Sequence, residues 1–212
     1  MRGYLRAKGY VIAARFEGDI SWAEQLLLVR PNAVDVLRET AWVIVCSGFR
    51  ALVARKMWPG LTEAYHQWDP TKVDRWCVER ARRTLGHRGK LKAIVKVAET
   101  IRTEGHERIV ADAAHPERLQ RLPWVGPITC YHLAKLLGQD VVKPDIHLQR
   151  AAKAAAVASP LELATRVKRA TGDPLTVIDS VLWRYGEQRR LQGWPSWEEL
   201  LGVQPRTAAL GA

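Results

Sequence analysis

One carboxylate and one tight turn are the features of this chain whose residue types and spacing could do chemistry. Asp145 follows Pro144 at the expected start of a helix, and it lies seventeen residues after Ile128 in the run Leu122–Thr129. A carboxylate held there can stabilise positive charge that develops on a reacting group, and it can orient or deprotonate water. The same position suits an ordinary helix N-cap. The two roles are compatible because a capping carboxylate is held rigidly.

The run Leu122–Thr129 reads Leu-Pro-Trp-Val-Gly-Pro-Ile-Thr and predicts a hairpin between two short helices. Gly126 allows a tight backbone turn, and Pro127 suits the first turn of the following helix. The amides of Val125, Gly126 and the next turn are expected to point outward at a helix N-terminus, which favours a phosphate. An ordinary helix–helix turn has the same pattern, so the motif alone leaves both readings open. The residues predicted to bind a nucleic-acid backbone are Pro123, Trp124, Val125, Gly126, Pro127 and Thr129.

Composition favours a polyanionic partner. Lysine and arginine number 33 against 22 acidic residues, for a formal charge of +11. Such an excess strengthens binding to nucleic acid through the release of phosphate counterions. The three cysteines form no CxxC pair, and no apolar run reaches membrane length. We therefore expect a cytoplasmic protein with reduced thiols and without a membrane partner.

The pattern of apolar residues predicts an all-α chain. Helices are expected over about 22–30, over 33–57 with a break at Ser47-Gly48, from Asp69 to about Gly86, over 90–103, from His115 into the hairpin, over 127–137, and from Asp145, Ser159, Asp173 and Ser196 onward. Tyr10–Arg15 is left as a short extended piece, and residues 203–212 as a loose tail.

The hairpin, followed by Lys143-Pro-Asp-Ile-His-Leu-Gln-Arg150, resembles the helix-hairpin-helix DNA glycosylase superfamily, which includes endonuclease III and the alkyl-base glycosylases. The likeness extends from about Ala41 to Gln188. It implies a two-lobed helical bundle over residues 1–202 with the active site in the cleft between the lobes. One lobe would span about 33–143, and the other about 1–32 with 144–202.

The resemblance also implies roles for individual residues. Asp145 would promote hydrolysis of the N-glycosidic bond of a base flipped out of duplex DNA, leaving an abasic site. Phe49 would fill the gap in the duplex as an intercalating wedge. The remaining predicted sites are a base pocket of Trp42, Tyr131, Trp183 and Tyr185, and phosphate contacts at Arg50, Arg88, Lys90 and Arg150.

Three departures from the family pattern bear on mechanism. Trp124 stands where the hairpin usually has glycine, and Ile128 stands where some relatives carry the lysine that forms a Schiff base. No four-cysteine cluster follows Gly186, so the iron–sulfur centre of some relatives is not expected. The sequence thus predicts a monomeric, monofunctional enzyme acting on double-stranded DNA, with no cofactor and no metal. A monovalent cation at the hairpin is left open.

Two alternatives remain open at this stage. A lysine from elsewhere, such as Lys135, Lys143 or Lys90, would make the protein a bifunctional glycosylase and AP lyase, although the Lys143 side chain is expected to point away from Asp145. The chain could also be a non-catalytic DNA-binding protein. The sequence does not choose between an alkylated or otherwise damaged base in DNA repair and a bulky modified base of phage DNA in antiviral defence.

Overall fold

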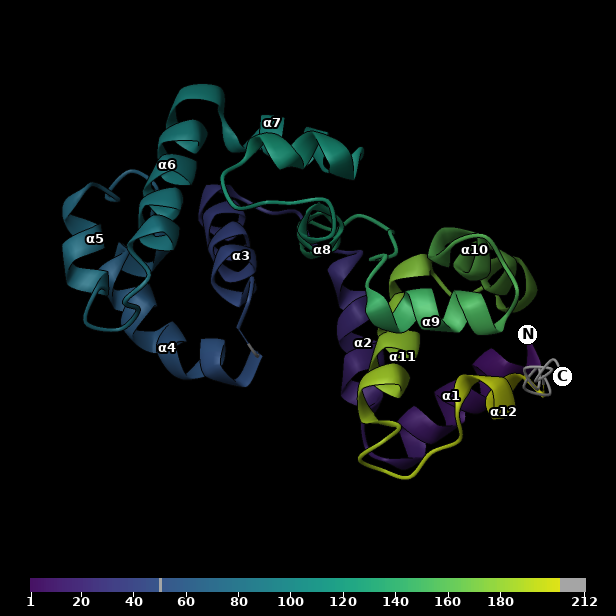
Figure 1. Cartoon of the computed structure of the whole chain (residues 1–212). Coiled ribbons are helices and arrows are strands. Elements are labelled where there is room, and N and C mark those ends of the chain that lie inside the picture. The colour runs from purple at the N-terminus through teal and green to yellow at the C-terminus, as the bar shows by residue number, and fades with distance from the viewer. Residues whose placement is uncertain (50, 203–212) are drawn as a thin grey trace, which may run out of the picture. The chain divides into compact units, whose positions relative to one another are not determined.

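The computed structural model describes residues 1–49 and 51–202, and every regular element in that part of the chain is a helix (Figure 1). This confirms the prediction of an all-α chain. The α-helices are α1 Arg2–Ala13, α2 Glu17–Leu26, α3 Ala33–Cys46, α4 Ala51–Ala64, α5 Trp76–Ala81, α6 Arg88–Glu104, α7 His106–Asp112, α8 Thr129–Leu136, α9 Ile146–Ala154, α10 Pro160–Thr171, α11 Leu175–Gln188 and α12 Trp197–Leu201, with short 3-10 helices η1 His66–Trp68 and η2 Pro116–Arg121. The predicted tail over residues 203–212 lies outside the described residues.

The chain divides into two compact units. Residues 28–139 form one, which we call the continuous unit, and residues 1–27 together with those from 140 onward form the other, the discontinuous unit. The sequence placed the corresponding boundaries at about residues 33 and 143. No helix within residues 1–49 and 51–202 is long and apolar enough to cross a membrane.

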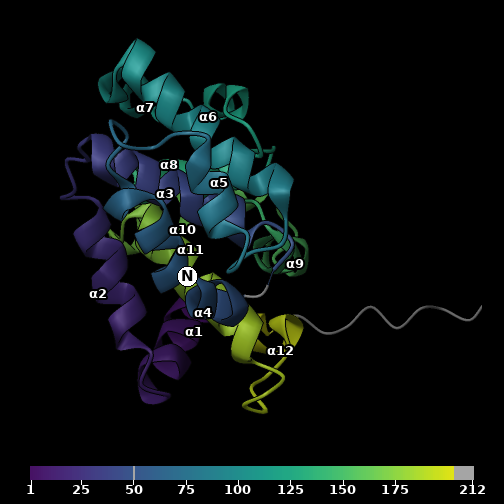
Figure 2. The same ribbon diagram turned by 90° about the vertical axis from the view of Figure 1, so that its left-hand side faces the viewer.

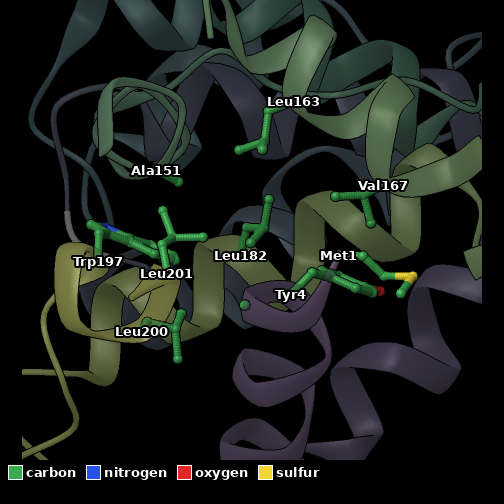
Figure 3. Close-up of a pocket in the computed structure, with 10 residues that line it drawn as sticks. Met1, Tyr4, Ala151, Leu163, Val167, Leu182, Trp197, Leu200 and Leu201 are labelled. Atoms are coloured by element: carbon green, nitrogen blue, oxygen red, sulfur yellow. The ribbon is translucent and has the colours of Figure 1, made fainter. Parts of the chain in front are cut away.

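Helix α11 is the centre of the discontinuous unit. Helices α1, α2, α9 and α10 all pack against it, as Figures 1 and 2 both show. Its buried face includes Val177, Ile178, Val181 and Tyr185, in the spacing of an amphipathic helix. A small apolar hollow of about 40 Å³ remains between α1, α9, α10, α11 and α12, lined by side chains such as Tyr4 and Trp197 (Figure 3).

Helix α6 is the central helix of the continuous unit and packs against both α3 and α5 (Figure 2). Its apolar residues recur at helical spacing, and Leu91, Ile94 and Ala98 are fully buried. The helix ends at Gly105, whose φ of 82° lies in the left-handed region that favours glycine. The sequence predicted this helix over 90–103, close to its observed bounds.

Side-chain caps explain several helix starts. Asn32 accepts hydrogen bonds from the Val34 and Asp35 amides and forms a capping box with Asp35 at the start of α3. Ser159 accepts from the Glu162 amide and precedes Pro160, the first residue of α10. The predicted start at Ser159 is therefore confirmed.

The prediction was wrong at the N-terminus. Tyr10–Arg15 is not extended, since α1 runs from Arg2 to Ala13. The buried face of α1 includes Gly3 and Ala7, whose small side chains give a weak hydrophobic signal. The helix expected over about 22–30 is α2, which begins earlier, at Glu17; Ser21 lies inside it, and its hydroxyl donates back to the Glu17 carbonyl at 3.4 Å.

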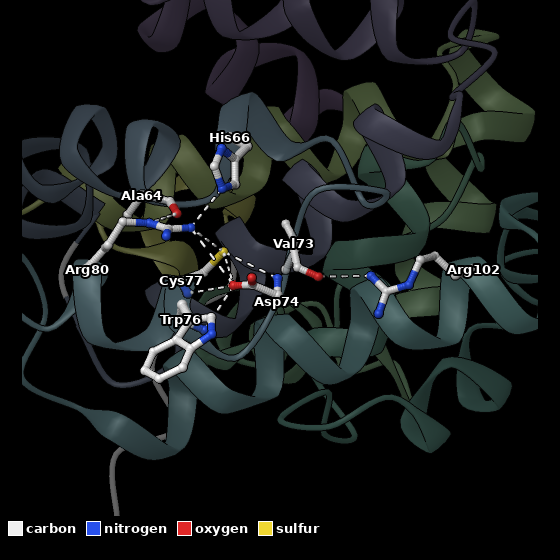
Figure 4. Close-up of polar contacts among 8 residues, drawn as sticks. All are labelled: Ala64, His66, Val73, Asp74, Trp76, Cys77, Arg80 and Arg102. Atoms are coloured by element: carbon white, nitrogen blue, oxygen red, sulfur yellow. Dashed lines mark hydrogen bonds and ion pairs between the residues drawn. The ribbon is translucent and has the colours of Figure 1, made fainter.

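The expected helix from Asp69 to Gly86 shortens to α5. Asp69 Oδ1 accepts hydrogen bonds from both the amide and the hydroxyl of Thr71, which stabilises a turn in place of a helix. Figure 4 shows how side chains fix the segment before α5. Arg80 contacts His66 Nε2 at 2.7 Å and Cys77 Sγ at 3.1 Å, while Arg102 donates to the Val73 carbonyl at 3.0 Å.

Candidate functional site

Asp145 is the N-cap of α9, and its two carboxylate oxygens have different partners. Oδ1 accepts hydrogen bonds from the His147 amide at 2.9 Å and the Leu148 amide at 3.2 Å. Oδ2 lies 3.2 Å from the Lys143 ammonium, and the side chain is only 12% exposed. The carboxylate is therefore held rigidly by its capping oxygen, while the other oxygen is engaged only by a lysine side chain that can rotate.

Two hydrogen bonds hold residues 140–143, the segment before Asp145, against α11. Asp140 Oδ1 accepts from the Thr176 amide at 2.9 Å, and the Lys143 amide donates to Asp179 Oδ1 at 2.8 Å. Asp179 is 5% exposed, so this bond forms largely away from competing water. Sequence reasoning missed Asp179 as a positioning residue. The available signal was a lone carboxylate inside the apolar run of α11.

The position of Lys143 contradicts the sequence-based expectation. Its side chain was expected to point away from Asp145, but its ammonium forms an ion pair with that carboxylate. Pro144 between them leaves the Asp145 amide donating to the Lys143 carbonyl at 2.8 Å, a tight turn that brings both side chains to the same side. An amine therefore accompanies the carboxylate.

Close packing of α9 on α11 depends on a glycine. A Cβ atom built on Gly186 would lie 2.8 Å from His147 Nδ1 and 2.9 Å from His147 Cβ, which is too close for any other residue without movement. Thus the His147 ring lies against α11 through Gly186. This contact shows how α11 sets the position of the helix that Asp145 caps.

The predicted hairpin residues lie between η2 and α8 in the continuous unit. Trp124 adopts a φ of 64°, in the left-handed region, at the position where the motif usually has glycine. The Val125 amide donates to the Leu122 carbonyl at 3.2 Å, and the Gly126 amide donates to Thr129 Oγ1 at 2.7 Å. The backbone thus forms a closed turn.

Those two bonds correct the prediction that the Val125 and Gly126 amides are free for a phosphate, since both are satisfied within the turn. The correction applies only to these two residues, and the donors that remain lie in the next turn, which the same prediction included. Within the described part of the chain, the Ile128 and Thr129 amides at the start of α8 have no acceptor, and no side chain caps this helix. A phosphate would therefore bind at Ile128 and Thr129 rather than at the turn itself.

Lys90 is not on the surface, so it does not provide the phosphate contact predicted for it. The residue is 2% exposed, and its ammonium donates to the carbonyls of Val45, at 2.9 Å, and Ser47 at the end of α3. Burial lowers the pKa of this ammonium from its ordinary value. The cation sits 4.5 Å from the centre of the Phe49 ring and so fixes the loop that carries the predicted wedge. Phe49 itself is 38% exposed.

The remaining predicted phosphate contacts have different surroundings. Arg88 is exposed and forms an ion pair with Glu79 at 3.2 Å. Arg150 is exposed on α9. Arg50 lies outside the described residues. Of these candidates, Arg150 follows Asp145 within its own helix, a little more than one turn from the carboxylate.

Two of the four predicted pocket aromatics lie in the continuous unit. Trp42 is half-buried and meets Trp58 edge to face, with ring centres 5.0 Å apart. Tyr131 donates its hydroxyl to Glu117, and that hydrogen bond raises the pKa of Tyr131 to about 12. Each of these two side chains therefore has a local partner of its own within the continuous unit.

The other two predicted pocket aromatics lie on α11 in the discontinuous unit. Tyr185 is fully buried and donates its hydroxyl to the Pro195 carbonyl at 2.7 Å; burial raises its pKa to about 12. It is therefore a core residue, and its predicted place in a base pocket is corrected. Trp183 is half-buried, with the Arg184 guanidinium 4.7 Å from its ring centre.

The candidate groups are the Asp145 carboxylate and the Lys143 amine in the discontinuous unit, and the Ile128 and Thr129 amides in the continuous unit. Among the described residues, no cluster of three or more His, Cys, Asp or Glu side chains could hold a metal ion. Comparisons with protein-family models, curated proteins and solved structures found no match for this chain. Its function is therefore inferred from its own residues.

Proposed function

We propose that this protein is a DNA glycosylase of the helix-hairpin-helix type, which flips a damaged or modified base out of duplex DNA and hydrolyses its N-glycosidic bond. Asp145 is the catalytic residue, and the reaction ends at an abasic site. The observation that carries the proposal is the rigid, poorly exposed carboxylate of Asp145, which keeps one oxygen outside the backbone hydrogen bonds. Breaking the base–sugar bond builds positive charge on the sugar, which such a carboxylate stabilises.

Several features support a DNA substrate. The net charge of +11 favours a polyanion. The Ile128 and Thr129 amides offer donors for a phosphate, next to a hairpin sequence that resembles the family motif. Phe49 and Trp124 are exposed aromatic side chains in the same unit, and unstacked bases need such surfaces. A protein that only bound DNA would need Asp145 solely as the cap of α9.

The test is a panel of duplex oligonucleotides, each with one alkylated, oxidised, deaminated or bulky modified base. Released base is measured directly, and abasic sites are measured as strand breaks after alkali. Release of one class of base with the strand left intact supports the proposal. If no member of a broad panel loses its base while the protein still binds duplex DNA, the non-catalytic alternative is correct.

A second candidate function is favoured by one specific contact, the 3.2 Å approach of the Lys143 ammonium to Asp145. If Asp145 accepted a proton from Lys143, the free amine could attack the sugar C1′ and displace the base. Asp145 would pass its proton to the departing base, and proton transfer from the bound nitrogen to the ring oxygen would open the sugar to a Schiff base. Removal of a C2′ proton by the Asp145 carboxylate would then expel the 3′ phosphate, and water would hydrolyse the imine and release the lysine. The protein would in that case be a bifunctional glycosylase and AP lyase.

Borohydride distinguishes the two functions. We expect the wild-type protein to give no trapped covalent complex and no strand breaks before alkali, because Ile128 occupies the hairpin position of the amine and Lys143 is held as a charged partner of Asp145. Lys143→Gln is the matched variant. A complex trapped by the wild type and absent from Lys143→Gln would overturn the hydrolytic assignment in favour of the lyase.

A further inference from the structure

Trp124 has a backbone conformation that its side chain does not favour. Its φ of 64° lies in the left-handed region, which a bulky residue rarely adopts and which glycine adopts freely. Its side chain does not compensate by full burial, because Trp124 is 43% exposed. A strained backbone that presents a large exposed side chain is typical of a functional position.

The surroundings of Trp124 hold its indole in place. The His87 ring meets the indole edge to face, with ring centres 4.9 Å apart at 90°. Gly89 lies against both rings, since a Cβ built there would be 3.4 Å from Trp124 Cζ2, an ordinary contact, and 3.3 Å from His87 Cε1, a slightly tight one. The indole is therefore positioned by packing on one side while the rest of its surface remains exposed.

Phe49 and Trp124 share one buried cation. The Lys90 ammonium lies 4.5 Å from the centre of the Phe49 ring and 5.6 Å from that of Trp124, within reach of a cation–π interaction in both cases. Because Lys90 is itself fixed by the carbonyls of Val45 and Ser47, it sets the position of both rings. Two exposed aromatic side chains, distant in the sequence, thus form one aromatic pair in the continuous unit.

We propose that the aromatic pair of Phe49 and Trp124 is a binding site for unpaired nucleobases, in which Trp124 provides a stacking surface of its own beside the wedge. The inference rests on the DNA-binding part of the proposed function. A nucleobase fits because the rings offer exposed π surface and the chain has a formal net charge of +11. The Ile128 and Thr129 amides, which have no acceptor among the described residues, follow Trp124 closely in sequence and can hold a phosphate of the same strand.

The left-handed φ provides a sharp test, because glycine is the residue that this backbone prefers. Trp124→Gly removes the indole while relieving the backbone, and Trp124→Phe keeps an aromatic ring on the same backbone. Binding is measured by fluorescence anisotropy on two duplexes of equal length, one fully paired and one with a single unpaired 2-aminopurine. Thermal melting is recorded for both variants to confirm that each is folded.

For Trp124→Gly we expect roughly tenfold weaker binding to the duplex with the unpaired base, because one base–aromatic stack is lost. Binding to the fully paired duplex should change little. Trp124→Phe should retain most of the preference for the unpaired base. Phe49→Ala, as a second variant, should also lower that preference. Equal binding of both duplexes by Trp124→Gly and wild type, or an equal loss on both, would overturn the inference.

The failure of this inference is distinguishable from failure of the proposed function. If the wild-type protein releases base and Trp124→Gly keeps the full preference for unpaired bases, the stacking site is refuted and the glycosylase function stands. If the preference for unpaired bases depends on Trp124 but no base of the panel is released, the stacking site is supported and the glycosylase function is refuted.

Discussion

Replacing Asp145 by Asn should lower the rate of base release by at least about a hundredfold while leaving DNA binding unchanged or tighter. Asn keeps an oxygen that can accept from the His147 and Leu148 amides, so α9 should still begin in the same place. What is lost is the negative charge that stabilises the sugar cation. The same loss removes a repulsion from DNA phosphates, which explains the binding result. Single-turnover base release and duplex affinity, measured on the same oligonucleotide, check both parts.

A control is needed because Asp145→Asn also breaks the ion pair with Lys143. Such a partly exposed pair contributes about 1 kcal/mol or less to stability. Asp173→Asn is the matched variant, since Asp173 also pairs with a lysine, Lys8, at 2.7 Å in the same unit. We expect Asp173→Asn to release base at nearly the wild-type rate. Wild-type activity in Asp145→Asn, or an equal loss in both variants, would show that Asp145 is only a cap.

Much of the fold could be predicted from the sequence, where caps and apolar spacing act together. Ser159 before Pro160, and the apolar spacing of α6, locate helices close to their observed bounds. The errors have local causes. Gly3 and Ala7 hide the buried face of α1, and the Asp69–Thr71 hydrogen bonds favour a turn over a helix. Such competition between side-chain and helical hydrogen bonds is not visible in residue spacing.

The candidate site was predictable where the residue acts through its local backbone. Asp145 at a helix start follows from its position after Pro144, and the structure places it as an N-cap. Residues that act through distant contacts were missed or misplaced. Lys90 is a basic residue in a basic run, yet its ammonium binds carbonyls of α3 more than forty positions away in sequence. Asp179 similarly fixes Lys143 from another helix.

The contacts made by Lys90 and Asp179 suggest a common principle. In each unit, a buried charged side chain from a central helix binds the backbone of the segment that presents a candidate functional residue: Phe49 in one unit and Asp145 in the other. Buried charges need such partners, and the bond in turn restricts the segment. The proposed chemistry therefore depends on groups that never touch DNA.

The second large effect is expected for Gly126→Glu, which should weaken binding to duplex DNA of any sequence by roughly tenfold or more at low salt. A steric clash is not expected, since a Cβ on Gly126 would lie 3.8 Å from Thr129 Oγ1, an ordinary contact, and Gly126 does not have a positive φ. The substitution therefore tests the effect of a negative charge at the hairpin on DNA binding. A carboxylate beside the free Ile128 and Thr129 amides would repel a phosphate that binds there.

Gly126→Gln is the matched control because it adds a side chain of the same size without the charge. We expect Gly126→Gln to bind within a few-fold of the wild type and both variants to melt at similar temperatures. The difference between Glu and Gln should shrink as salt rises, since the repulsion between exposed charges is screened. If Glu and Gln bind duplex DNA equally at low salt, no phosphate binds at the start of α8, and the hairpin is an ordinary turn between η2 and α8.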